Sequence, residues 1–213
     1  MKTALTLGMI CLALSFCGLQ ERLQSLTGGG NSNSASTNSN SSSTSSSSGD
    51  KVEVAKPSSA QQAIIDAGTE TKWDEQGISW RLPSGFKKQN VGKEQFFYMG
   101  PDNSSLIVSI SVMPDSFPMD TSMKAYHEQA LQQLKNGKYE SVKMVEIDGV
   151  SGVQFTEASP EKSDDIRRHQ WIGYRSYLGQ KQQVNMITST RGNNFSKHAD
   201  EFVAIVYSAK FTK

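Results

Sequence analysis

The fold is decided by Leu106-Ile107-Val108-Ser109-Ile110-Ser111-Val112, in which every second residue from Leu106 is aliphatic. A period of two is typical of a strand with one face in a core. Ile107 and the following Met113 put apolar side chains on the opposite face as well. We therefore expect helices to cover part of this second face.

A helix is expected to follow this strand, from about Ser122 to Asn136. Its apolar residues fall on one stripe, formed by Met123, Tyr126, Ala130, Leu131 and Leu134. Asp120 or Thr121 can cap its first turn, and Gly137 stands where a left-handed C-cap is expected. The chain therefore passes from a period of two to a helical period across residues 106–136.

Paired strands are expected on both sides of this strand–helix unit. The expected strands are residues 77–82, 96–99, 143–147, 150–157, 167–178, 181–190 and 209–211, and a second helix begins near Asn194. Strands in adjacent pairs with two inserted helices predict an α+β domain whose sheet is mostly antiparallel.

The order of these elements resembles the PsbP-like fold, which the extrinsic photosystem subunit of that name shares with the Mog-type Ran-binding proteins and many small bacterial lipoproteins. The resemblance is carried by Ile78-Ser79-Trp80-Arg81-Leu82-Pro83-Ser84-Gly85-Phe86, the 106–112 strand and its helix, Ile147-Asp148-Gly149 before residues 152–155, and residues 202–211. It implies an α/β/α sandwich with a central, mostly antiparallel sheet flanked by helices, over residues 72–213. It also implies roles in binding or assembling other proteins, with neither a shared cofactor nor a catalytic motif.

The first 17 residues have the layout of a secretory signal peptide. Lys2 precedes an apolar run that is shorter than the ~20 residues needed to span a bilayer. The run ends at Cys17, which resembles the lipidated Cys of a bacterial lipobox, although Phe16 precedes it. The open alternative is an ordinary signal peptide in which Cys11 and Cys17 are two small apolar residues.

Residues 18–56 are interpreted as a flexible tether. Within them, residues 28–49 hold 11 Ser, 4 Asn and 4 Gly and carry no charge, so they offer almost nothing to bury. Residues 57–71 are expected to form a short helix or linker, and residues 72–213 the folded domain. A tether of this kind favours the lipidated interpretation of Cys17, because it needs a fixed point at its far end.

Composition disfavours several function classes. Lys and Arg number 22 against 21 Asp and Glu, which does not suit a nucleic-acid-binding protein. No nucleophile elbow, phosphate-binding glycine loop or paired-carboxylate signature is present, so we expect no enzyme activity and no cofactor. His127 and His198 each stand near a carboxylate, but we expect them to be solvated helix residues and not metal ligands.

A partner-binding patch is predicted on the strand at residues 167–178. Arg167, Trp171, Tyr174 and Arg175 belong to the residue types that dominate binding hot spots. Both faces of this strand mix aromatic and charged residues, which could leave part of the sheet uncovered for a partner. The alternative is that the arginine stems pack along neighbouring side chains and need no partner.

These observations predict a non-enzymatic cell-envelope lipoprotein, anchored to the membrane through Cys17, whose tethered domain binds or helps assemble another envelope protein. The alternative is a periplasmic domain that binds a small ligand or metal in a pocket between sheet and helix.

Overall fold

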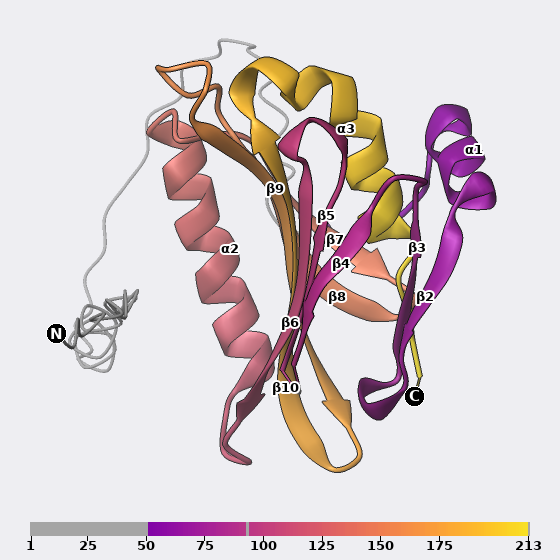
Figure 1. Ribbon diagram of the computed structural model, residues 1–213. Helices are drawn as coiled ribbons and strands as arrows, with labels where there is room; N and C mark the ends of the chain where they lie inside the picture. The colour runs from indigo at the N-terminus through magenta and orange to yellow at the C-terminus, as the bar shows by residue number, and fades with distance from the viewer. Residues whose placement is uncertain (1–50, 93, 213) are drawn as a thin grey trace, which may run out of the picture. The chain divides into compact units, whose positions relative to one another are not determined.

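The computed structural model describes residues 51–92 and 94–212, which form an α/β/α sandwich around an eight-stranded sheet (Figure 1). In spatial order the strands are β1 (Glu53–Val54), β7 (Tyr139–Ile147), β8 (Val150–Glu157), β9 (Ile166–Tyr177), β10 (Gln180–Arg191), β6 (Ser105–Met113), β5 (Gln95–Met99) and β4 (Lys87–Val91). All neighbouring strands pair antiparallel except β1 and β7, which are parallel. The expected α+β class with a mostly antiparallel sheet is therefore confirmed.

Different elements cover the two faces of this sheet (Figure 1). One face carries α2 (Met119–Lys135). The other carries α3 (Gly192–Tyr207) and a second sheet in the order β11 (Lys210–Phe211), β3 (Ile78–Leu82) and β2 (Thr69–Trp73), while α1 (Ser59–Ala67) packs on α3. Short 3-10 turns lie at η2 (Asp74–Gln76) and η3 (Pro101–Asn103).

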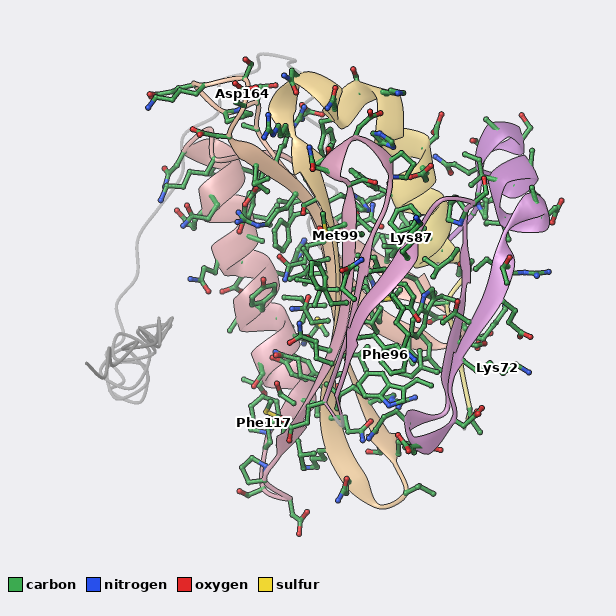
Figure 2. The ribbon with its side chains drawn as sticks, in the orientation of Figure 1. Lys72, Lys87, Phe96, Met99, Phe117 and Asp164 are labelled. Carbon is green, nitrogen blue, oxygen red and sulfur yellow. The ribbon has the colours of Figure 1, made fainter. Side chains whose placement is uncertain are left out.

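The second sheet was not anticipated from the sequence. The alternation in β3 was recognised, but a period of two does not say which strand will be its partner. In the structure β3 pairs with β2 and β11, and its buried residues Ile78, Trp80 and Leu82 face the main sheet. Figure 2 shows Phe96 in the space between the two sheets, where its ring lies 4.7 Å from that of Trp73.

The larger hydrophobic core of the domain lies between the two sheets. Trp171 is its central side chain and has no exposed surface. From β9 its indole crosses Gly152 on β8, and its Nε1 donates a hydrogen bond of 3.1 Å to the carbonyl oxygen of Val145 on β7. A Cβ atom on Gly152 or Gly173 would stand 2.4 Å from the indole. The two glycines are therefore required by the close approach of the ring to the sheet.

A smaller core joins α2 to the other face of the sheet. Its buried members are Met123, Ala130, Val153, Phe155 and Ile172. Helix α2 begins at Met119 and has no side-chain cap, so the expected caps at Asp120 and Thr121 were wrong. Gly137 does adopt the left-handed conformation expected after the helix, with φ of +71°.

Both edges of the main sheet differ from expectation. At one edge, residues 53–54 pair with β7, and the amide of Ala55 donates to the carbonyl of Glu146 at 2.8 Å, so the folded unit begins inside the segment interpreted as tether. At the other edge, β4 was missed because Lys87 and Lys88 give it no apolar alternation. A register shift separates Lys88 from Asn90 in its pairing with β5. Within the described residues, no helix is long and apolar enough to cross a membrane.

We predict that Gly173→Ala lowers the free energy of unfolding by about 1–3 kcal/mol, because the added methyl group overpacks the core against Trp171. Gly92→Ala is the matched control, since its nearest contact would be an ordinary 3.7 Å. Urea unfolding of both variants measures the difference. Equal stabilities for the two variants would show that Trp171 does not need the glycine.

Candidate functional site

The four residues predicted as a partner-binding patch do not share an exposed surface. Trp171 is fully buried, and Arg167 and Arg175 are only 8% and 6% exposed beneath α3 and the second sheet. Tyr174 points to the opposite face of β9, where its ring lies 5.2 Å from that of Phe117. The prediction of one accessible patch at these four positions is therefore wrong.

The two arginines are held by contacts within the chain. Arg175 donates from Nε to Gln182 Oε1 at 3.1 Å, bonds the carbonyl of Gln76 and lies over the ring of Tyr177. Burial lowers its pKa to about 10. Arg167 donates from Nε to the carbonyl of Glu157 at 2.8 Å and lies 4.2 Å from the ring centre of Phe195. These contacts agree with the alternative interpretation that the arginines need no partner, but both guanidinium groups bond within the protein and do not lie in water.

All three histidines are buried, so the expectation of solvated helix residues was wrong for His127 and His198. His198 lies between two carboxylates, with Nδ1 3.2 Å from Glu201 Oε1 and Nε2 3.1 Å from Asp102 Oδ2. These contacts hold η3 against α3. Within residues 51–92 and 94–212, no group of three His, Cys, Asp or Glu side chains could hold a metal ion.

His169 lies on the face of the sheet beneath α3 and is 3% exposed. Its Nδ1 is 3.0 Å from the hydroxyl oxygen of Thr156, while Nε2 has no hydrogen-bond partner among the described residues. Burial, together with the positive charge of Lys143, lowers its pKa to about 4. The imidazole is therefore neutral near pH 7 and acts as part of the core.

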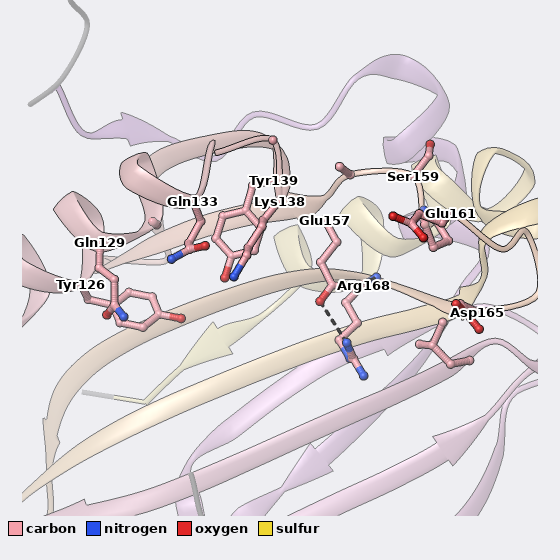
Figure 3. A pocket seen from close by; sticks show the side chains of 15 residues that line it. Tyr126, Gln129, Gln133, Lys138, Tyr139, Glu157, Ser159, Glu161, Asp165 and Arg168 are labelled. Carbon is pink, nitrogen blue, oxygen red and sulfur yellow. Dashed lines mark hydrogen bonds and ion pairs between the residues drawn. The ribbon is translucent and has the colours of Figure 1, made fainter. Parts of the chain in front are cut away.

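The candidate site is an open groove of about 680 Å³ at the C-terminal end of α2 (Figure 3). It is lined by Tyr126, Gln129, Ala130, Gln133, Gly137, Lys138, Tyr139, Glu157, Ala158, Ser159, Pro160, Glu161, Asp165, Ile166 and Arg168. These residues come from α2, the ends of three strands and the loop of residues 158–165, which we call the acidic loop. This volume lies within the range of known ligand pockets.

The floor of the groove combines aromatic rings with polar tips. Tyr139 stacks on Phe155 at 4.3 Å between ring centres, and Tyr126 lies 6.4 Å from the same ring. Burial raises the pKa of Tyr126 and of Tyr139, so both phenols stay neutral and keep a proton to donate. Gln133 Oε1 is buried and has no partner among the described residues. The floor can therefore both stack against and hydrogen-bond a bound group.

The rim of the groove is charged and rigidly held. Arg168 Nη1 lies 2.9 Å from Glu157 Oε1, and the Arg168 amide donates to Glu157 Oε2 at 2.9 Å (Figure 3). The acidic loop accepts the first amides of α3, with Gly192 donating to the Asp165 carbonyl at 2.9 Å and Asn193 to that of Ser163 at 2.8 Å. Because these bonds replace a side-chain cap on α3, the loop is fixed before any ligand arrives.

Sequence reasoning missed this groove because its residues come from separate segments. The sequence pattern places Tyr126 on the apolar stripe of its helix and Glu157 in a hairpin strand, whereas Tyr139 falls outside every expected element. The one local signal was the polar stretch of residues 158–165, with three acidic residues and one Lys between two strands. Loops of this kind, placed by a rigid scaffold, often carry function.

No protein-family model matches the sequence, and the comparison with curated proteins found no significant match. Among solved structures, LpqN of Mycobacterium tuberculosis, involved in cell envelope biogenesis, matches with a TM-score of 0.51 at 14% identity, over 74% of this chain and 99% of LpqN. At this identity the comparison shows the fold alone.

Two further structures match at lower TM-scores. The cyanobacterial PsbP of Synechocystis sp. PCC 6803 matches with a TM-score of 0.46 at 14% identity, over 68% of this chain and 94% of that protein. A protein from Bacteroides thetaiotaomicron VPI-5482 matches with a TM-score of 0.46 at 17% identity, over 69% of this chain, which spans only 49% of that protein. The PsbP-like fold expected from the sequence is confirmed by the observed sandwich together with the LpqN match.

We predict that acidification from pH 6.5 to pH 4 destabilises the protein through His169. Unfolding restores the ordinary His pKa of about 6.5, so in this window the unfolded chain binds a proton that the folded chain excludes. The resulting loss of stability is on the order of 3 kcal/mol for a pKa lowered to about 4.

The prediction is checked by urea unfolding across this pH range. His169→Asn should lose this part of the pH dependence, whereas Thr156→Val, which keeps the imidazole, should retain it. The same pH slope in wild type and His169→Asn would contradict the assignment.

Proposed function

We propose that this chain is an exported, non-enzymatic protein of the cell envelope, anchored through Cys17, whose domain binds an extended segment of another envelope protein in the groove beside α2. The observation that carries the proposal is the preorganised groove, which has an aromatic floor, neutral phenols, an unpartnered amide oxygen and a charged rim.

An extended peptide fits the chemistry of this floor. A peptide backbone offers amide donors for Gln133 Oε1 and carbonyl acceptors for the hydroxyl groups of Tyr126 and Tyr139. Ile166 lies at the groove and is 46% exposed, so it adds apolar surface that a side chain of the peptide can cover. The groove thus offers both polar and apolar contacts to a bound peptide.

The charge of the rim favours a basic segment. Three acidic residues that line the groove (Glu157, Glu161 and Asp165) outnumber two basic ones (Lys138 and Arg168), and the side chains of Glu161 and Asp165 are exposed. Charges at the edge of a binding site mainly set specificity and the rate of association. We therefore expect the bound segment to pair an apolar or aromatic residue with a Lys or Arg.

Two observations outside the groove support an envelope role. The signal-like segment ending at Cys17 and the uncharged Ser/Asn/Gly tract suit a protein held at a membrane by a tether. LpqN, which has this fold, is involved in cell envelope biogenesis, and this is compatible with a similar location for this chain. Residues 1–50, which include Cys17, lie outside the described residues.

The groove proposal predicts that a photo-crosslinking amino acid at position 166 captures an envelope polypeptide. The double variant Glu161→Lys/Asp165→Lys should reduce that capture severalfold, because it reverses the charge that a basic segment meets. Both side chains are exposed, so the fold should persist, and circular dichroism checks this.

Glu94→Lys/Asp115→Lys is the matched control, because it makes the same charge change at exposed positions outside the groove. Crosslinking measured by mass spectrometry should be unchanged in this control. Equal capture in both double variants, or equal capture by the same crosslinker placed at the exposed Val112, would reject the groove as the binding site.

The anchoring proposal predicts that Cys17→Ala moves the protein from the membrane to the soluble fraction, because the lipid attachment point is lost. Cys11→Ala should leave it in the membrane fraction. Fractionation followed by immunoblotting measures both. Failure of a fatty-acid analogue to label the wild-type chain during growth would contradict lipidation.

A further inference from the structure

A second cavity of about 400 Å³ lies on the α3 side of the sheet and shares no lining residue with the groove. Its walls come from the segment entering α1, from β7 and β8, and from α3. It is lined by Lys56, Pro57, Ser58, Gln61, Lys143, Gln154, Val203 and Tyr207.

Gln154 provides the observation that points to a ligand. The side chain is 5% exposed, and its Oε1 has no hydrogen-bond partner in the described part of the chain. Leaving a buried acceptor unsatisfied costs about 1–3 kcal/mol, so such an atom is uncommon without a functional reason. Because this oxygen can only accept, a ligand that satisfies it must supply a donor.

Two lysines line the same cavity. Lys143 pairs with Gln154 in the register of β7 and β8, and Lys56 lies at the entrance to α1. Two carboxylates lie near this cavity. Glu53 Oε2 forms a long ion pair with Lys143 Nζ at 3.7 Å, and Asp200 accepts a hydrogen bond from Gln61 Nε2 at 2.9 Å. Neither carboxylate lines the cavity.

The N-terminus of helix α1 lies at this second cavity. Ser58 caps the nine-residue helix, with its Oγ accepting from the Gln61 amide at 3.2 Å, and both residues line the cavity. The amides of Ser59 and Ala60, like those of any first helical turn, have no acceptor within the helix. A helix N-terminus favours a negative charge, and two lysines strengthen that preference.

We propose that this cavity binds a phosphate group that retains a proton, either as inorganic phosphate or as the end of a soluble phosphate monoester. Its anionic oxygens would face Lys56, Lys143 and the start of α1, and its P–O–H group would donate to Gln154 Oε1. One ligand thus meets both the positive wall and the buried acceptor. Sulfate has the same shape but carries no proton at neutral pH, so it leaves Gln154 unsatisfied.

The test is calorimetric titration of the purified full chain at pH 6.5 and constant ionic strength. The ligands are inorganic phosphate, glycerol 3-phosphate and sulfate. Phosphate or the monoester should bind at least tenfold more tightly than sulfate, and the tighter of the two identifies the source of the phosphate group. Equal affinity for phosphate and sulfate would overturn the proposal.

Variants locate the binding. Gln154→Leu should lose the preference for phosphate over sulfate, and Lys56→Gln/Lys143→Gln should weaken phosphate binding at least tenfold. The lysine variant keeps a measurable outcome if Gln154→Leu does not fold, since Lys56 is exposed and Lys143 half-buried. Lys51→Gln/Lys124→Gln is the control, because it removes the same charge at exposed positions outside both this cavity and the groove.

Phosphate affinity that is unchanged in Lys56→Gln/Lys143→Gln would also overturn the proposal. This test and the crosslinking at position 166 use different residues. The failure of one therefore leaves the outcome of the other unchanged.

Discussion

The fold depends on the indole of Trp171 lying flat across two glycines. Gly152 and Gly173 leave space on neighbouring strands, and the ring reaches a carbonyl on a third strand, so one side chain ties β7, β8 and β9 together. Above the ring, Phe211 stacks at 5.8 Å and brings the second sheet against the first. The last strand of the chain is thereby fixed to the middle of the main sheet.

At the groove, the acidic loop likewise has two structural roles. Its backbone carbonyls cap α3, while its side chains form the rim beside α2. The loop therefore connects the helices on opposite faces of the sheet. A site placed on such a loop keeps its shape without needing order from the ligand, which lowers the entropic cost of binding.

Local periodicity accounts for most of what the sequence predicted. The strand at 106–112 and the helix after it are signalled by their own residues, and they appear as β6 and α2. What the pattern could not show depends on partners distant in sequence. Arg167 and Arg175 resemble surface residues in the sequence, because the carbonyls of Glu157 and Gln76 that bind them are not their neighbours there. The groove likewise forms only where α2, the ends of three strands and the acidic loop meet.

The edges of the main sheet affect whether neighbouring copies of the protein can pair strand to strand. A free strand edge is a template for pairing with another chain, and one edge here is covered by the short parallel β1 only at Val145 and Glu146. The opposite edge presents Lys87 and Lys88 next to an irregular register. A second copy approaching that edge would meet like charges and a disrupted ladder, so the sheet resists growing from one molecule into the next at this side.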